Sequence, residues 1–396
     1  MSLLATLRRH KLVGVCPPAR GAVLDELTRV DPAPVWMVVA PELKIAEQLV
    51  EDIALFHKGS GDGREMEVLL FPEAMPETRE MREAFAASAD RQTVLSKLKG
   101  RRSVSVVSSG RSPTLVVVTT PAALLQPVPA LEAFAEKEVM LQRGKPQSFQ
   151  GLLETLRDLD YDSEAVCESP GHYSVRGGII DVYPITANEP YRLDFFGDEI
   201  ESIKAFDPVT QRSGAAVESI PLSASPRLKL ASSTVGLADY LSPATHLVLV
   251  EPAELDEELA AAARGGERGF TALLEKVAAL TGVSDLDEAS AFLDGDAVEE
   301  RMWDADSLSH HRSYPDDTLV AQERLQSEVE ARHAFLNKLA GWKKLGYGLV
   351  FVVSKEGEEQ RAKEILEEDR ALSGLQPVWW RGALNEGFRI TYRDTE

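Results

Sequence analysis

Apolar runs that alternate with segments of helical periodicity restrict this chain to an α/β architecture. The runs Val35–Val39, Leu115–Val118 and Leu247–Val250 are continuously apolar, which is typical of strands buried on both faces. Residues 42–56 and 254–264 instead repeat apolar side chains with the spacing of a helix. Strands that alternate with helices of this length predict a parallel sheet covered on both faces by helices.

The pattern changes along the chain and divides it into four regions. Residues 1–130 alternate helix and strand, whereas residues 131–225 contain short strands and turns typical of a separate α+β domain. Residues 226–315 return to α/β character, so we expect the middle domain to be inserted into the first. Residues 316–396 predict a charged linker helix followed by a small third α/β domain that ends incomplete.

The fourth region, residues 316–396, has a predicted core of its own. A charged helix is expected over residues 316–340, and the strand 349–353 is expected to be buried. The side chains that should form the buried stripe of the helix are Leu319, Leu325, Val329, Phe335, Leu336 and Leu339.

Charge and cysteine content narrow the class of function. The chain has 396 residues and a net charge of -21. Proteins that bind DNA tightly usually carry a basic stripe that displaces counterions from phosphates. Protein partners are therefore expected rather than bare nucleic acid.

Cys16 and Cys167 are too far apart in sequence for a zinc motif and suit a reducing cytosol. No apolar run reaches membrane-spanning length.

The loop Gly14–Gly21 precedes a predicted helix and is the candidate phosphate-binding loop. A working loop needs backbone N–H donors, a lysine for the phosphates and a Ser or Thr for magnesium. Here the lysine position after Ala19 holds Arg20 or Gly21, depending on the register, and no Ser or Thr follows. The prolines before them lack N–H groups. We therefore expect an inactive nucleotide loop, no ATP or magnesium cofactor, and no catalytic residue.

Other candidate motifs are weaker. Residues 256–258 are acidic but open a helix, where negative charge complements the helix dipole. The adjacent His310 and His311 point in different directions and make a poor metal site. No metal site is expected, although a catalytic triad scattered in sequence stays open.

Residues 176–213 carry the most specific signal. Tyr191, Leu193 and Phe195 alternate with Arg192, Asp194 and Phe196, so one set should face the core and the other should face solvent. The polar set would bring Phe196 to the surface beside Arg192, and arginine and aromatic side chains are common anchors of protein interfaces. The alternative is that Phe196 lies under a loop or in a second small core. The irregular alternation near Ser202 suggests a bulge.

These residues resemble a known family. The segments RGGIIDVYP at 176–184 and YRLDFFGDEI at 191–200 resemble the second domain of the UvrB family, in the version found in bacterial transcription-repair coupling factors (Mfd). The segment GVCPPARGAVLDEL, which starts at Gly14, resembles the degenerate nucleotide loop at the start of that family. The segments 237–252 and 346–366 resemble its later parts, so the resemblance covers nearly the whole chain.

The resemblance implies a function and a partner. It implies that this N-terminal module lacks ATPase activity and recruits UvrA, the damage-recognition subunit of nucleotide excision repair. Arg176, Arg192 and Phe196 match the UvrA-binding residues by motif position. RNA polymerase, DNA, ATP and magnesium would be engaged only by a remainder of the protein that includes a translocase, in the bacterial cytoplasm. The alternative is a nucleotide- or DNA-dependent helicase-like enzyme related to UvrB.

Overall fold

The fold is known from a computed structural model. It describes residues 7–74, 81–102, 113–132, 138–225, 233–263, 269–295, 297–312, 321–368, 372 and 375–391. The predicted boundary at 315/316 lies outside these residues, and so does residue 226 at the boundary 225/226. All three predicted boundaries stay predictions.

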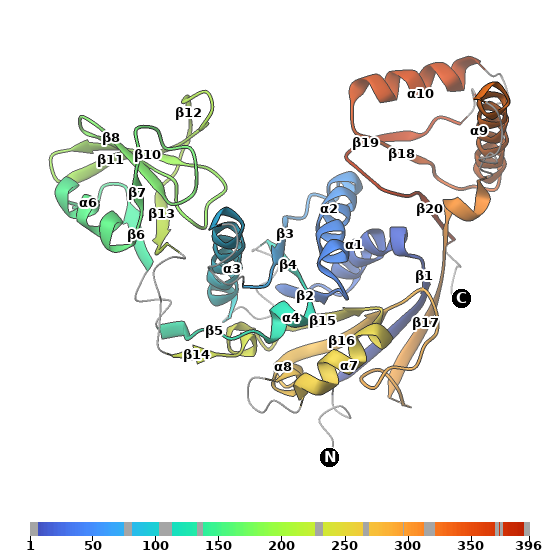
Figure 1. Cartoon of the computed structure of the whole chain (residues 1–396), viewed down its shortest axis with the longest axis horizontal. Helices are drawn as coiled ribbons and strands as arrows, with labels where there is room; N and C mark the ends of the chain where they lie inside the picture. Colours follow the sequence, from blue (N-terminus) through green and yellow to red (C-terminus); the bar gives the residue numbers. More distant parts are fainter. Residues whose placement is uncertain are drawn as a thin grey trace.

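A large sheet forms the centre of the molecule (Figure 1). Its strand order is β20-β17-β1-β16-β15-β2-β4-β3, and the pairs are parallel except β17 with β20. Strands from both ends of the chain contribute, which agrees with the predicted α/β class. The strands are β1 (Arg8–Val15), β2 (Val35–Val39), β3 (Met66–Phe71), β4 (Thr114–Thr119), β15 (Thr245–Val250), β16 (Val277–Val283), β17 (Val298–Ser307) and β20 (Phe388–Ile390).

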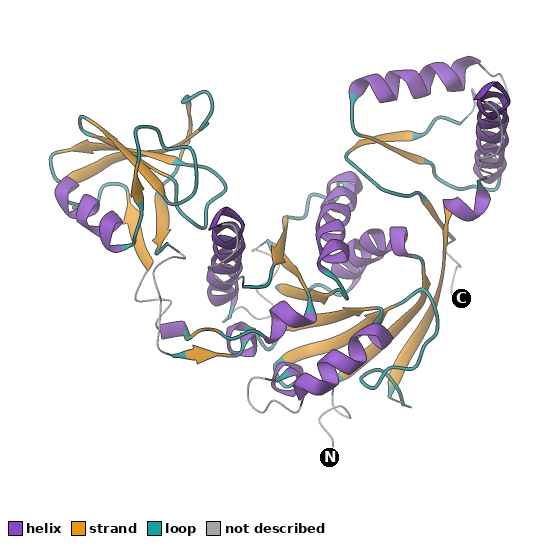
Figure 2. Ribbon diagram, in the orientation of Figure 1, coloured by secondary structure: helices purple, strands orange, loops and turns teal. Residues whose placement is uncertain are grey.

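Helices cover the two faces of this sheet (Figure 2). Along β2, Met37 packs into one core with the helices α3, α7 and α8, whereas Trp36 packs into the other core with α1 and α2. Strands buried on both sides need apolar residues at every position, which explains the continuous apolar run of β2. The helices are α1 (Arg20–Val30), α2 (Leu43–Ser60), α3 (Met81–Arg101), α4 (Pro121–Leu125), α7 (Pro252–Ala263) and α8 (Phe270–Leu274), with 3-10 turns η2 (Pro17–Ala19) and η4 (Leu237–Tyr240).

A separate, mainly antiparallel sheet lies at one end of the molecule (Figure 1). Its order is β12-β11-β10-β9-β8-β7, and helix α6 (Phe149–Asp158) packs on it. Lys99 of α3 pairs with Glu138 and ties this part to the large sheet. Its strands are β7 (Asp162–Ser163), β8 (His172–Arg176), β9 (Ile179–Val182), β10 (Tyr191–Phe196), β11 (Glu199–Phe206) and β12 (Ser213–Ala216). Two further sheets have two antiparallel strands each. They are β6 (Glu138–Gln142) with β13 (Ser219–Ser223), and β5 (Val128–Pro129) with β14 (Thr234–Val235).

The C-terminal region corrects two predictions. In α9 (Ala321–Lys344), Leu336 and Leu339 are buried, but Leu325 is 63% and Val329 is 41% exposed. Among the described residues, only the last turns of α9 contact the small core that contains Leu336, and the rest of the predicted stripe lies outside that core. Leu319 lies outside the described residues.

The predicted buried strand is also more open than expected. Strand β18 (Val350–Val353) pairs with β19 (Val378–Arg381) in a parallel ribbon beside α10 (Glu356–Glu368), and Val350 is exposed. No further strand joins this ribbon within the described residues, which explains the exposure. The 3-10 turn η6 (Leu308–His311) precedes this region.

Candidate docking surface

Two tight hairpins build the surface that the sequence singles out. Strands β8 and β9 are joined at Gly177, whose φ of 61° lies in the left-handed region that glycine adopts without strain. Strands β10 and β11 are joined at Gly197, with φ of 60°. The pairing shifts between Asp194 and Phe195, which leaves Glu201 of β11 as an extra residue. This bulge confirms the irregularity predicted near Ser202.

The strand register places the predicted residues on one face. Arg192 pairs with Asp181 of β9, and Asp194 pairs with Ile179, which itself pairs with Arg176 of β8. Directly paired residues share a face of a sheet, and so do residues two positions apart along a strand. Arg176, Arg192 and Phe196 are therefore brought to the same face.

The alternation along β10 separates this face from the core. Leu193 is buried, whereas Phe196 at the hairpin tip is 80% exposed. The solvent-exposed interpretation of Phe196 is therefore confirmed over a second core or a covering loop. A hydrophobic ring held in solvent by a hairpin is a feature of protein-binding surfaces.

Arg192 is less exposed than the sequence suggests. Its Nε and Nη2 donate to the two carboxylate oxygens of Asp181, at 2.7 and 2.8 Å. The Asp181 side chain is 1% exposed and the Arg192 side chain 18%. The hydrogen bond to Asp181 raises the pKa of Arg192, and its guanidinium lies 4.8 Å from the centre of the Phe206 ring. The expectation that Arg192 faces solvent freely is corrected: it forms a largely buried ion pair.

Asp181 is the residue that sequence reasoning missed. It interrupts the apolar strand Ile179–Val182, and that interruption was the available signal. A carboxylate buried in a strand needs a charged or hydrogen-bonding partner. Its partner comes from the neighbouring strand, and nothing in the local sequence identifies it.

Arg176 remains at the surface. Its Nη2 donates to the carbonyl oxygen of Ala165 at 3.3 Å, in the loop that precedes β8. The same loop contains Cys167, whose thiol donates to the carbonyl of His172 and whose pKa is raised to about 12 by burial. A buried thiol with a raised pKa is a poor nucleophile, so Cys167 has a structural role.

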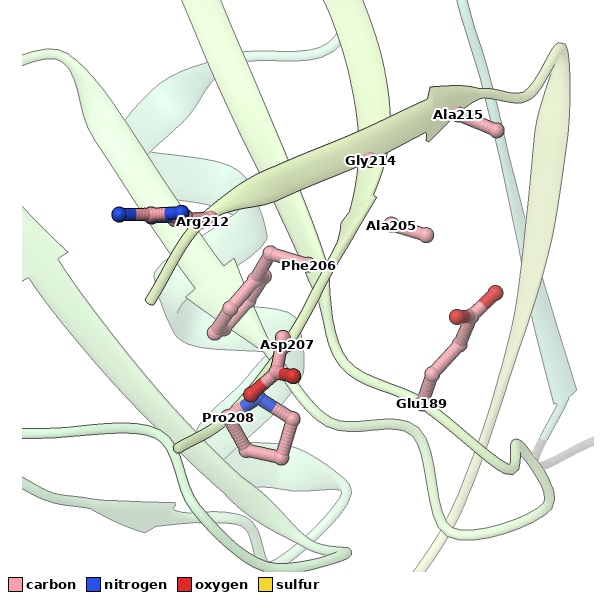
Figure 3. Close-up of a pocket in the computed structure, with 8 residues that line it drawn as sticks. All are labelled: Glu189, Ala205, Phe206, Asp207, Pro208, Arg212, Gly214 and Ala215. Atoms are coloured by element: carbon pink, nitrogen blue, oxygen red, sulfur yellow. The ribbon is translucent and has the colours of Figure 1, made fainter. Parts of the chain in front are cut away.

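A folded loop borders the far end of this face. The Oδ1 atom of Asp207 accepts hydrogen bonds from the backbone N–H groups of Val209 and Thr210, both at 2.8 Å. Nη1 of Arg192 donates to the carbonyl of Gln211 at 3.4 Å and to Oγ of Ser213 at 3.3 Å. A hollow of about 390 Å³ lies beside the loop (Figure 3), and its lining includes Glu189, Ala205, Phe206, Asp207, Pro208 and Arg212.

The predicted inactive nucleotide loop lies elsewhere, at the end of β1. Arg20 is buried, and its guanidinium pairs with the carboxylate of Glu251. Gly14 has φ of 81°, and a Cβ there would lie 2.3 Å from the carbonyl oxygen of Trp303. In the structure, Gly14 thus permits close packing against the backbone of Trp303, and Arg20 forms an internal ion pair with Glu251.

The acidic residues at 256–258 and the pair His310–His311, which the sequence raised as weaker candidates, have structural roles. Asp256 accepts hydrogen bonds from Oγ of Ser290 and from the backbone of Ala291. His310 and His311 both contact the carboxylate of Asp306. Among the described residues, no group of three or more His, Cys, Asp or Glu side chains could hold a metal ion. Within the same ranges, no helix is long and apolar enough to cross a membrane.

Comparisons with known proteins agree with this geometry. The UvrB interaction domain family matches residues 139–226, which include every strand of the candidate surface. The chain is 26% identical to the transcription-repair-coupling factor of Bacillus subtilis and 32% identical to that of Myxococcus xanthus, in each case over 54% of this chain and 17% of the relative. It is also 35% identical to UvrABC system protein B of Thermus thermophilus, over 19% of this chain and 12% of that protein.

The matched part is thus a small fraction of each of these relatives. It nevertheless contains the surface built from β8 to β11, where the sequence motifs and the strand register agree. Residues 139–226 match the UvrB interaction domain family, and they lie in a chain that is similar over about half of its length to transcription-repair-coupling factors.

Proposed function

We propose that this chain is a non-catalytic adaptor of transcription-coupled nucleotide excision repair and that it recruits UvrA. The observation that carries the proposal is the face on which the strand register brings together Arg176, Arg192 and the exposed ring of Phe196. This face lies inside the part of the chain that matches the UvrB interaction domain. Exposed aromatic and arginine side chains supply much of the binding energy at protein interfaces.

The geometry of the Gly14–Gly21 loop supports the absence of catalysis. Arg20 is the only cation of this loop, and Glu251 already neutralises its charge. Pro17 and Pro18 cannot donate N–H groups to a phosphate. The chain by itself therefore needs no nucleotide or metal cofactor.

The similarity to transcription-repair-coupling factors supports a proposal for the wider role of the protein. We place this module at stalled RNA polymerase, with polymerase, DNA and ATP engaged by other parts of a longer protein. The net charge of -21 supports this division, because the chain itself is repelled by nucleic acid phosphates.

Phe196→Ala tests the docking face. We expect this variant to lose about 2 kcal/mol or more of UvrA binding free energy, because the exposed ring acts as an interface anchor. Arg176→Ala should weaken binding as well. The measurement is calorimetric titration of UvrA with each variant, after circular dichroism has confirmed the fold.

Met140→Ala is the matched control, because Met140 is a large exposed side chain of the same domain on a different strand pair. It should bind UvrA as the unmodified chain does. Wild-type affinity in both Phe196→Ala and Arg176→Ala contradicts the proposed face. Arg192→Ala is a poorer test, since it leaves the buried carboxylate of Asp181 without its partner.

Titration with Mg-ATP separates the adaptor from the competing helicase-like enzyme. The adaptor should show no saturable heat and no release of phosphate. Saturable binding accompanied by hydrolysis by this chain alone overturns the non-catalytic assignment.

A further inference from the structure

The loop from Asp207 to Arg212 holds an apolar side chain in solvent. Val209 is 89% exposed, yet the backbone around it is held by hydrogen bonds to the carboxylate of Asp207. The N–H of Gln211 also donates to the carbonyl of Asp207 at 2.8 Å, and its side chain donates to the carbonyl of Pro208 at 2.6 Å. A loop closed on itself in this way loses little conformational entropy when a partner binds it.

This loop is continuous with the docking face. Arg192 of β10 donates hydrogen bonds to Gln211 and Ser213, and its guanidinium lies over the ring of Phe206, which leads into the loop. Val209 therefore borders the Arg192 end of the face, whereas Phe196 marks the other end of the same strand. The four residue-to-residue steps from Arg192 to Phe196 span about 13 Å at about 3.3 Å per step.

The charges of the face indicate the chemistry of its partner. Arg192 pairs with Asp181, and Lys204 lies 3.6 Å from Asp194. In contrast, no acidic side chain of the described residues pairs with Arg176 or Arg212. Figure 3 shows the Arg212 side chain directed away from the hollow beside the loop. In a chain of net charge -21, Arg176 and Arg212, which have no acidic partner among the described residues, favour an acidic partner surface.

We infer that the Asp207–Arg212 loop is a second contact site for UvrA and that Val209 is its apolar anchor. This inference rests on the proposed function. Val209 enters an apolar recess of UvrA, and Arg212 meets a carboxylate at the edge of that recess. The docking surface then has an apolar anchor at each end, Phe196 and Val209, with arginines beside both.

The inference assigns Arg192 a positioning role. Only 18% of its side chain is exposed, and its hydrogen bonds hold Gln211 and Ser213. Arg192 thus acts on UvrA binding chiefly through the loop that presents Val209, rather than through direct contact.

Val209→Ser and Arg212→Glu test the second contact site by titration against UvrA. We expect each variant to weaken the Kd by at least about 10-fold, within the range of interface anchors. The loss caused by Arg212→Glu should shrink as salt is added, because its interaction is electrostatic. Val175→Ser is the matched control. Val175 is also exposed, but it pairs with Ile180 and so lies on the opposite face of the sheet.

Phe196→Ala, measured in parallel, separates this inference from the proposed function. Wild-type affinity in Val209→Ser and Arg212→Glu, together with a loss in Phe196→Ala, overturns the second contact site and leaves the adaptor role intact. Wild-type affinity in all of these variants overturns the adaptor role itself. A loss in Val175→Ser equal to that in Val209→Ser also overturns the inference, because the effect is then not specific to the loop.

A double-mutant cycle tests the positioning role. Arg192→Lys keeps a positive charge for Asp181 but removes the fork of donors that also reaches Gln211 and Ser213. If Arg192 acts through the loop, Arg192→Lys should weaken binding in the unmodified chain and add little in the Val209→Ser background. Fully additive losses contradict the positioning role.

Discussion

Arg20 and Glu251 form an ion pair at the end of the large parallel sheet. Their side chains are 7% and 16% exposed, and the carboxylate also accepts a hydrogen bond from the backbone N–H of Asp285. Glu251 has φ of 51°, which is uncommon for a residue with a side chain. Burial raises the pKa of Glu251, and Arg20 opposes that shift. The pair places a carboxylate where a nucleotide phosphate would need a free cation.

Removing the charge of Glu251 should therefore cost stability. Glu251→Gln leaves the buried guanidinium of Arg20 without a counter-charge, and such losses are roughly 3–5 kcal/mol. Urea denaturation of the two proteins measures the difference. Glu218→Gln is the control, because the Glu218–Arg143 pair is exposed and should contribute at most about 1 kcal/mol. An equal effect of the two substitutions contradicts the assigned role of Glu251.

At the scale of elements, the contact between α1 and α2 explains another residue of the same loop. A Cβ on Gly21 would lie 2.5 Å from the Cβ of Asp52 and 3.0 Å from its backbone carbon. The two helices therefore approach closely only because Gly21 has no side chain. Gly21, which the sequence marks as part of a degenerate phosphate loop, is required here for helix packing.

Gly21→Ala should destabilise the protein by roughly 1–3 kcal/mol, as expected for overpacking of a tight contact. Gly341→Ala is the matched control in α9, because a Cβ there meets no atom within 4 Å. It should stabilise the protein by roughly 0.5–1 kcal/mol, since alanine is the better helix former. Thermal unfolding of both variants measures the contrast. Similar shifts of the same sign contradict the close approach of α1 and α2.

At the scale of the whole molecule, the C-terminal segment ties the β18–β19 ribbon to the central sheet. Trp380, at the end of β19, packs edge-on against Phe56 of α2, with ring centres 5.7 Å apart. Phe388 of β20 lies 5.5 Å from the same ring, and β20 joins β17 as the edge of the large sheet. Figure 1 shows this region at the opposite end of the molecule from the β8–β12 sheet.

Trp380→Ala should loosen this attachment without disturbing the docking surface. We expect faster amide hydrogen exchange in α9, β18 and α10, because their anchor on α2 is lost, and unchanged exchange in β8–β11. Val378→Ala, at an exposed position of the same strand, is the control. Unchanged exchange in α9 and α10 of the Trp380 variant contradicts the anchoring role.

The spacing of apolar residues predicted those helices and strands in which the apolar face is the face that is buried in the structure. Strand β2 lies at the predicted residues because apolar spacing records which faces are covered. The stripe on α9 is confirmed at its C-terminal end. It was wrong at Leu325 and Val329, which have the right spacing but lie outside the core formed by the described residues. Periodicity shows which face can be buried, whereas the presence of a partner is a tertiary property.

The sequence by itself determined the α/β class and the lack of a lysine in the nucleotide loop, whereas it left open whether Phe196 is exposed. These properties depend on residue type and on spacing within one segment. The tertiary structure alone decided that Arg192 pairs with Asp181, that Glu251 neutralises Arg20 and that Val209 borders the docking face. Each of these contacts joins residues from different elements, and the register and packing that bring them together come from the burial of the whole core.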